Sequence, residues 1–179
     1  MYEIGVNRLL GMTDLHAQGW QLHFAGHALP DRHSVEALAR LRTASAGLPV
    51  HVHANVPFAA LRDLYRRASI YWHATGYGSS ENLHPARQEH FGLTVVEAIS
   101  AGAVPVVLRS GGPKETIQEG VTGYLWDSLD ELARITRRLA ADPALLRCCR
   151  EQCVPRSAQF SSPAFADRVD RIVDRILNP

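Results

Sequence analysis

Residues 89–112 read EHFGLTVVEAISAGAVPVVLRSGG. The segment 91–101 contains only three polar side chains, which predicts a helix with no solvated face that is buried nearly all round. A glycine ends that helix, and the valine-rich run 104–108 after it predicts a buried strand. This helix and strand are the centre around which the rest of the chain is interpreted.

A carboxylate inside such a helix requires a partner. Burying Glu97 is costly unless it is hydrogen-bonded, and the hydroxyl groups of a ribose or a hexose are suitable partners. The helix start supplies free N–H groups and a dipole that favour an anion such as phosphate, and Gly92 lets a ligand approach the backbone closely. The segment therefore predicts a phosphate site at the helix start and a sugar-hydroxyl site about two turns along.

Composition limits the classes of protein to consider. The 179 residues are enough for one domain with a sizeable core, and 46% apolar with 21% charged residues is typical of globular proteins. A formal net charge of +1 argues against nucleic acid as a partner, because phosphate backbones are bound by clustered Lys and Arg. No apolar run reaches membrane-spanning length and the N-terminus lacks a signal-peptide layout, so we expect no transmembrane segment and a cytoplasmic location.

The cysteines and histidines do not predict a metal site. Cys148, Cys149 and Cys153 crowd one predicted helix, and nothing nearby completes the four ligands of zinc, so we expect reduced thiols. His51 and His53 share one strand face, but no carboxylate or third histidine stands at metal-ligand spacing with them. We therefore expect no metal in the chemistry.

Predicted strands and helices alternate along the chain. The predicted strands are 20–26, 50–56, 70–72, 104–108 and 120–126. The predicted helices are 7–18, 31–47, 57–67, 91–101, a short one from residue 114, 129–141, 143–155 and 162–177. Residues 73–90 interrupt this pattern as a long loop, and loops of that length in a compact domain are usually functional or disordered.

This alternation predicts a three-layer α/β/α Rossmann-like domain with a parallel sheet. Ligands of such sheets bind beyond the carboxyl ends of the strands. The loop after Gly26, the Asn55-Val56 turn, the loop at Glu89 and the Gly111-Gly112 turn are expected to converge there. A nicotinamide enzyme is a poor fit, because no Gly-x-Gly-x-x-Gly fingerprint follows the first strand.

Several segments together resemble a known family. Glu89 and Glu97 stand with seven residues between them, followed by SGGPKE at 110–115 and GVTGYL at 120–125 and preceded by LRDLYRRASIYW at 61–72. These segments resemble the C-terminal domain of retaining glycosyltransferases of the GT-B fold, within glycosyltransferase family four, also called group one. The resemblance covers roughly residues 19–177.

The resemblance implies roles for particular residues. Glu89 matches the catalytic glutamate placed near the donor sugar, where it orients hydroxyls and stabilises positive charge at the anomeric carbon. Glu97 matches the glutamate that binds the ribose hydroxyls of the nucleotide. The remaining donor-binding residues that it implies, or that the predicted convergence of loops adds, are Phe91, Gly92, Leu93, Thr94, Asn55, Val56, Gly111 and Gly112.

Each assignment has a purely structural alternative. In the structural alternative, Glu97 would pair with an Arg of a neighbouring element, and Glu89 would be an ordinary loop carboxylate. Phe91 would fill the core, and Gly92 would serve only a tight turn. The pair at 111–112 is then no more than a connection from strand to helix.

The chain also departs from the family pattern. Relatives carry, one strand earlier than Trp20, a Gly-Arg pair and a Lys that neutralise the donor diphosphate, and the residues before Arg8 do not reproduce that strand. Arg8, Arg109 and Lys114 are partial substitutes at best. We therefore interpret residues 1–179 as a single donor-binding domain in which the first strand and the N-terminal acceptor domain are missing.

The predicted function is the donor half of an enzyme that transfers a hexose, with retention, from a nucleotide-diphosphate sugar to a glycan or lipid acceptor. No cofactor is expected beyond that donor substrate, and the isolated chain is expected to be inactive. Its partner is the nucleotide sugar, with a separate acceptor-binding domain or a homo-oligomer as a further possibility. The alternative is a non-catalytic nucleotide-sugar-binding or protein-interaction module, because an uncovered cleft face favours association. A sugar phosphorylase is a weaker third option, since no pyridoxal-phosphate lysine is identified.

Overall fold

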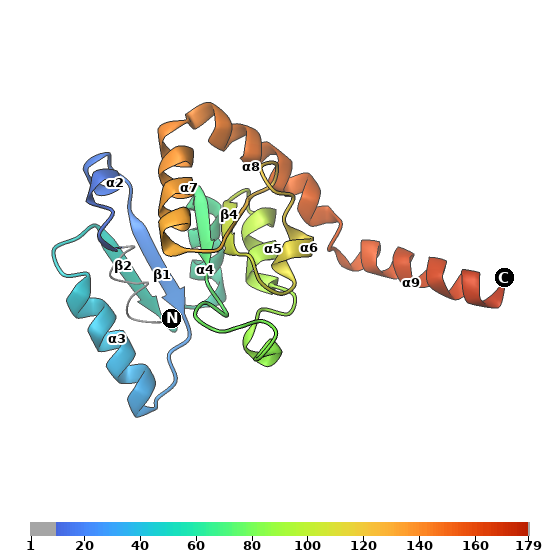
Figure 1. Cartoon of the computed structure of the whole chain (residues 1–179), viewed down its shortest axis with the longest axis horizontal. Helices are drawn as coiled ribbons and strands as arrows, with labels where there is room; N and C mark the ends of the chain where they lie inside the picture. The colour runs from blue at the N-terminus through green and yellow to red at the C-terminus, as the bar shows by residue number, and fades with distance from the viewer. Residues whose placement is uncertain (1–9, 179) are drawn as a thin grey trace.

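The computed structural model of the chain describes residues 10–178 (Figure 1). Its strands are β1 (Leu22–Gly26), β2 (Val50–Ala54), β3 (Ile70–His73), β4 (Val104–Leu108) and β5 (Tyr124–Trp126). Its helices are α2 (Thr13–Ala17), α3 (Arg32–Ala44), α4 (Phe58–Arg67), η1 (Pro85–Arg87), α5 (Leu93–Ser100), α6 (Pro113–Thr116), α7 (Leu129–Ala141), α8 (Pro143–Ala158) and α9 (Ser162–Leu177). Parallel strands flanked by helices confirm the predicted α/β Rossmann-like class.

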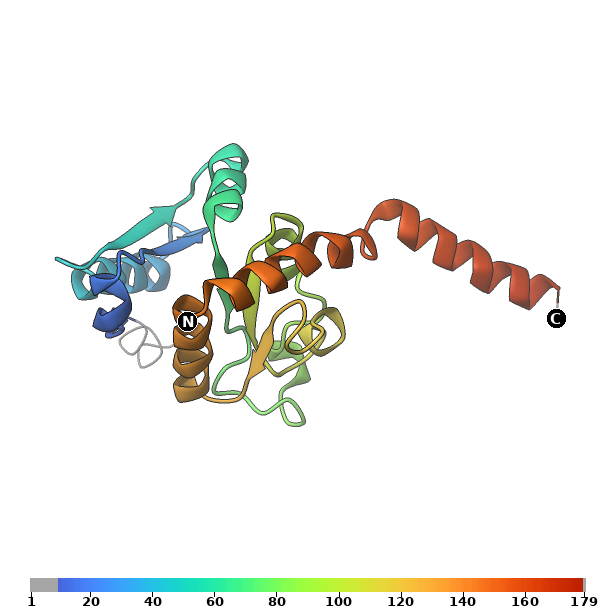
Figure 2. The ribbon, with the colours of Figure 1, turned by 90° about the horizontal axis from the view of Figure 1, so that it is seen from above.

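The strands form two parallel sheets rather than the single sheet predicted from the sequence. β1 pairs with β2 from Leu22 opposite Val50 onward, while β3, β4 and β5 form a second sheet in that order. Within residues 10–178 no ladder joins β1 to β3, and both views show the two-stranded sheet set apart from the other three strands (Figures 1 and 2). The alternating pattern predicts that strands exist and run parallel, but a ladder also requires two strands to lie within hydrogen-bonding distance.

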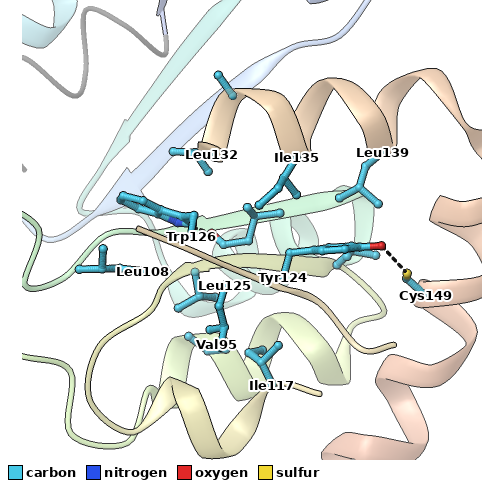
Figure 3. Packing of buried hydrophobic residues seen from close by; sticks show 14 of the residues in the cluster. Val95, Leu108, Ile117, Tyr124, Leu125, Trp126, Leu132, Ile135, Leu139 and Cys149 are labelled. Carbon is cyan, nitrogen blue, oxygen red and sulfur yellow. Dashed lines mark hydrogen bonds between the residues drawn. The ribbon is translucent and has the colours of Figure 1, made fainter. Parts of the chain in front are cut away.

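The main core surrounds the three-stranded sheet. Every residue of β4 and β5 is buried, as expected of parallel strands covered on both faces. Leu132, Ile135 and Leu139 of α7 cover one face, and Val95 of α5 with Ile117 lies against the other (Figure 3). Trp126 is fully buried between them, and its indole N–H donates to the Val106 carbonyl at 3.2 Å.

Helix α5 corrects the prediction of burial on all sides. Val95, Ala98 and Ile99 face the core, but Leu93 is 69% exposed, and Thr94, Glu97 and Ser100 are exposed with it. The exposed residues recur at helical spacing and line one side of the helix. The prediction is wrong because apolar composition does not require burial, and Leu93 on this side stays in solvent.

The C-terminal helices differ from one another. Helix α8 packs against α5, and its Cys149 and Cys153 are buried free thiols. It runs three residues beyond its predicted end and includes Pro155. Helix α9 keeps its predicted bounds, has no buried residue, and extends away from the body (Figures 1 and 2). No helix within the described residues is long and apolar enough to cross a membrane.

Candidate functional site

Glu89 lies across the start of α5, with both carboxylate oxygens engaged. Its Oε1 accepts from the backbone N–H of Gly92 at 2.9 Å and of Phe91 at 3.4 Å. Its Oε2 lies 3.3 Å from Nε2 of His73. The helix start that was predicted to attract an anion therefore already faces a carboxylate of the protein itself, which suits the local dipole.

The conformation of Gly92 explains how the chain reaches this arrangement. Gly92 precedes α5 with φ +83°, in the left-handed region that favours glycine, and a Cβ there would come within 3.1 Å of the Val95 side chain. This turn directs its N–H at Glu89. Phe91 is 44% exposed and meets the Phe160 ring edge-on at 6.0 Å, so it does not fill the core. Leu93 and Thr94 form the exposed first turn.

Gly111 and Gly112 pack directly on the backbone that carries Glu89. A Cβ on Gly111 would lie 2.1 Å from the Glu89 carbonyl oxygen, and one on Gly112 would lie 2.0 Å from that of His90. The N–H of Gly112 donates to the Glu89 carbonyl at 2.9 Å. The two glycines are therefore required for this close contact, which fixes the Glu89 loop against the end of β4.

The loop before Glu89 is fixed by a second device. The buried side chain of Gln88 accepts a hydrogen bond from the Ser110 hydroxyl at 2.6 Å and donates to the carbonyl groups of Ser79 and His84 at 3.4 Å. Long loops need such internal partners to hold one conformation. Gln88 and Ser110 thus tie the segment that carries Glu89 to the end of the central strand.

Glu97 lies on the exposed side of α5, close enough to Tyr65 of α4 to affect the pKa of its hydroxyl. Burial, Tyr71 and Glu97 together raise the pKa of the Tyr65 hydroxyl on α4. Among residues 10–178 no ion pair joins Glu97 to an Arg or Lys. The exposed carboxylate keeps acceptor capacity for the hydroxyl groups of a ligand.

A row of rings connects the two glutamates. Tyr65 and Tyr71 lie 5.8 Å apart between ring centroids, and Tyr71 and His73 lie 6.4 Å apart. Burial raises the pKa of the Tyr71 hydroxyl, and the neighbouring Thr94 of α5 opposes this shift. The row thus runs from Tyr65, whose pKa Glu97 raises, to His73, which faces Glu89.

Sequence reasoning missed these three side chains, although a signal was present. Tyr71 and His73 alternate along β3 and therefore point to the same side of it, at the strand end that precedes the long loop. Polar residues at the carboxyl end of a parallel strand are candidates for a site. Tyr65 offered no comparable signal, because its place beside Glu97 depends on how α4 packs.

Asn55 and Val56 lie apart from this cluster, after β2 in the two-stranded sheet. Asn55 has φ +56°, and its side-chain amide accepts from the N–H of Ala28 at 2.8 Å and donates to its carbonyl at 3.1 Å. The side chain thereby fixes the loop after β1. Only backbone groups of this turn and the half-buried Val56 are left for a ligand.

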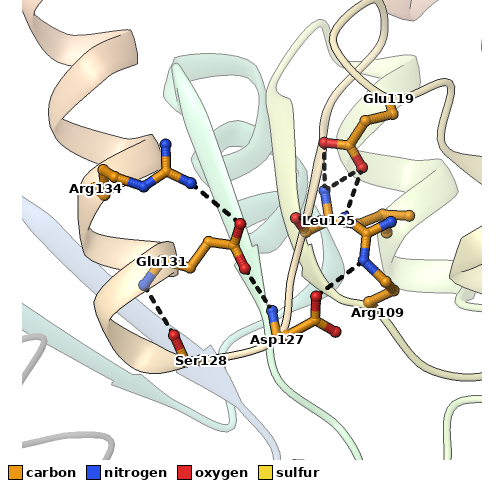
Figure 4. A network of polar contacts seen from close by, with 7 residues as sticks. All are labelled: Arg109, Glu119, Leu125, Asp127, Ser128, Glu131 and Arg134. Atoms are coloured by element: carbon orange, nitrogen blue, oxygen red, sulfur yellow. Dashed lines mark hydrogen bonds and ion pairs between the residues drawn. The ribbon is translucent and has the colours of Figure 1, made fainter.

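The two cations considered for the diphosphate are already paired. Arg109 binds Asp127 at 3.1 Å and Glu119 at 3.2 Å, within a polar network that Glu131 and Arg134 continue (Figure 4). Lys114 binds Glu81 at 2.8 Å. The alternative cation, Arg8, lies outside the described residues. A phosphate at either pair has to compete with a carboxylate already in place.

The histidine pair predicted to share a strand face does so and includes a third ring. His23 of β1 stacks on His51 at 4.7 Å and on His53 at 5.3 Å, and its Nδ1 lies 3.0 Å from Nε2 of His53. Burial and the neighbouring His51, His53 and Arg67 lower the pKa of His23. No group of three or more metal-ligating side chains with the geometry for an ion is found in residues 10–178.

Comparison with known proteins agrees with this architecture. Residues 4–153 match the protein family described as Glycosyl transferases group 1. A Xenopus laevis protein, GDP-Man:Man(3)GlcNAc(2)-PP-Dol alpha-1,2-mannosyltransferase, is 33% identical over 144 residues, which cover 77% of this chain and 26% of that protein. The chain thus spans about a quarter of the length of this relative.

Solved structures show the same fold. The C-terminal domain of a glycosyl transferase group 1 family protein from Francisella tularensis has a TM-score of 0.65 at 17% identity, covering 87% of this chain and 78% of that one. Anabaena HepE in complex with UDP-glucose has a TM-score of 0.73 at 19% identity, and the match covers 96% of this chain and 44% of that one. The chain belongs to the Glycosyl transferases group 1 family and has the α/β Rossmann-like fold found in GT-B glycosyltransferases.

Proposed function

We propose that this chain is the donor-binding half of a hexosyltransferase that uses a nucleotide-diphosphate sugar. The observation that carries the proposal is the placement of the two motif glutamates at one helix, Glu89 across its start and Glu97 within it. Glu89 lies across the start of α5, and Glu97 lies on its exposed side, joined by the ring row of Tyr65, Tyr71 and His73. Hydroxyl groups of a ribose and of a hexose suit these two carboxylates.

The proposed reaction assigns each carboxylate a role. Glu97 accepts hydrogen bonds from the ribose hydroxyls, and Glu89 orients the hexose and stabilises positive charge that develops at its anomeric carbon. Transfer proceeds with retention to a glycan or lipid acceptor. The nucleotide sugar is a substrate, and no cofactor takes part. Support for this donor class comes from the mannosyltransferase named above, whose name includes GDP-Man, and from HepE, solved with UDP-glucose.

Calorimetry on the whole chain tests donor binding. UDP-glucose and GDP-mannose are titrated into the wild type, Glu97→Ala, and Glu151→Ala as a control on the exposed side of α8. Glu97→Ala is expected to weaken binding about 10- to 100-fold, the equivalent of one or two lost charge-assisted hydrogen bonds. Glu151→Ala is expected to bind like the wild type. Equal binding by all three proteins contradicts the assignment of Glu97.

The isolated chain is proposed to be inactive in transfer. Within residues 10–178, β1 pairs only with β2 and β3 only with β4, and carboxylates already bind Arg109 and Lys114. Both features support a site that needs further protein to complete it. A radiolabelled-donor assay with the chain alone is expected to give no glycan product. Robust product formation contradicts this part of the proposal.

A second candidate is a non-catalytic interaction module, and α9 favours it. Three of its apolar side chains, Phe165, Ile172 and Ile176, are more than half exposed and recur at helical spacing. A stable complex with another chain, together with no nucleotide binding in the calorimetric test, supports this candidate. Binding that requires Glu97 supports the donor half.

A further inference from the structure

The end of β3 places a buried histidine beside the candidate catalytic glutamate. His73 is 8% exposed, and its Nε2 lies 3.3 Å from Oε2 of Glu89. The other oxygen of Glu89 accepts from the N–H groups at the start of α5. The carboxylate is thus held from two sides, by the helix on one oxygen and by the imidazole on the other.

The surroundings of the ring indicate which nitrogen carries the proton. Nδ1 is buried and has no hydrogen-bond partner in the described structure, so a proton there would be an unsatisfied donor. Nε2 faces the Glu89 carboxylate and the hydroxyl oxygen of Thr75, which is also 3.3 Å away. A proton on Nε2 therefore has an acceptor, and a proton on Nδ1 has none.

The charge state follows from burial. Burial lowers the pKa of His73, and this outweighs the opposing effect of the Glu89 carboxylate. The imidazole is therefore neutral near pH 7, with its single proton on Nε2. The ring of Tyr71 is its aromatic neighbour, 6.4 Å away between ring centroids.

We propose that His73 is a positioning residue: its Nε2–H donates to Glu89 and holds that carboxylate across the start of α5 in the orientation that meets the donor. The proposal rests on the proposed donor-binding function. A glutamate side chain has three rotatable bonds, and a carboxylate fixed through one oxygen still turns about that contact. Fixing the second oxygen removes this freedom before the sugar binds, and pre-organisation of this kind raises affinity.

Two substitutions separate positioning from packing. His73→Phe keeps the ring and removes both nitrogens, and because Nδ1 is already unpartnered, little stability is lost. His73→Gln retains an N–H donor at the reach of Nε2. In calorimetry with UDP-glucose and GDP-mannose, His73→Phe is expected to bind about tenfold more weakly, the equivalent of one charge-assisted hydrogen bond, and His73→Gln within about threefold of wild type.

A readout without ligand keeps this proposal separate from the proposed function. The Gly92 amide donates to Glu89, so its proton chemical shift and hydrogen-exchange protection report where that carboxylate lies. In His73→Phe the Gly92 amide is expected to shift and lose protection, and in His73→Gln to stay near wild type. If the wild type binds no nucleotide sugar, the donor proposal fails while this measurement still decides the role of His73.

Two results overturn the proposal. In the first, His73→Phe leaves both donor affinity and the Gly92 amide unchanged. In the second, His73→Phe and His73→Gln lose affinity equally and their melting temperatures fall together, which identifies a purely structural residue. Donor affinity that is lost in His73→Phe but retained in His73→Gln, with an unchanged melting temperature in His73→Phe, supports the positioning role.

Discussion

The two halves of the described fold differ sharply in how they are packed. Around the three-stranded sheet, β4 and β5 are buried at every residue, and α7 contributes six buried side chains. Around the two-stranded sheet, α3 and α4 contain no buried residue, and β1 and β2 are half-buried at best. Cooperative stability is therefore expected to reside in residues 70–153. Met12 and Leu15 join the main core, and the rest of the first half is held mainly by the ladder between β1 and β2.

This difference also separates the parts of the candidate site. Glu89, the start of α5 and the glycine pair belong to the well-packed half, which gives Glu89 a fixed position. The Asn55-Val56 turn belongs to the loosely packed half. The sugar end of the proposed donor site is therefore pre-organised, whereas the turn assigned to the base depends on a sheet that opens more easily.

The largest expected effect is the loss of a core leucine. Leu132→Ala on α7 removes a side chain that is 1% exposed, and the cavity is expected to cost about 2–5 kcal/mol of unfolding free energy. Leu38→Ala on α3 removes a half-buried side chain and is expected to cost about 1 kcal/mol. Urea denaturation followed by circular dichroism measures both. Equal losses contradict the division into two unequal halves.

A smaller effect is expected where the glycine pair meets the Glu89 loop. Gly112→Ala places a Cβ against the His90 carbonyl, and the forced shift is expected to cost about 1–3 kcal/mol and to weaken donor binding. Gly47→Ala is the matched control in the loosely packed half, because its φ is +76° but nothing lies within 4 Å of a Cβ. It is expected to cost about 1 kcal/mol and leave donor binding unchanged. Thermal denaturation and calorimetry measure the two properties, and donor binding that is unaffected by Gly112→Ala argues against this account of the loop.

Acid is expected to loosen the two-stranded sheet before the three-stranded one. The pKa of His23 is lowered by burial and by His51, His53 and Arg67, so its contribution to stability is complete above the unfolded value of about 6.5 and is lost as the pH falls below it. His73 has a lowered pKa as well, but it faces a carboxylate that offsets part of the cost.

Hydrogen exchange corrected for intrinsic rates measures this acid effect. Between pH 7 and pH 5.5 the amides of β1 and β2 are expected to lose protection, while those of β4 keep theirs. His23→Gln is expected to reduce the loss, because it removes the imidazole whose pKa is lowered. Parallel loss in both sheets shows that the two halves open as one unit.

The smallest effect is expected at an ion pair between the halves. Arg137 of α7 binds Asp14 of α2 through two contacts, at 2.6 and 3.0 Å. Both side chains are nearly half exposed, and such pairs contribute little. Asp14→Asn is expected to lower the melting temperature slightly and to leave the exchange of β4 amides unchanged. A loss as large as that of Leu132→Ala shows that the pair joins the halves more strongly than packing suggests.

Much of the candidate site was predictable because it rests on local chemistry. A glutamate beside an apolar helix start, a glycine before that helix and a glycine pair after the next strand each limit the backbone within a few residues. The structure brings Glu89, Gly92, Gly111 and Gly112 together as predicted. His73 and Tyr65 were not predicted, because their contacts join elements that are far apart in the sequence.

The sequence by itself determined the alternation of parallel strands and helices, the bounds of α7 and α9, and the motif that identifies the family. These depend on periodicity, capping and residue identity, which are local properties. Only the tertiary structure decided that the strands form two sheets, that one side of α5 is exposed, and that a neutral histidine faces Glu89. Burial and strand pairing depend on which elements pack against each other, and an apolar segment alone does not specify what covers it.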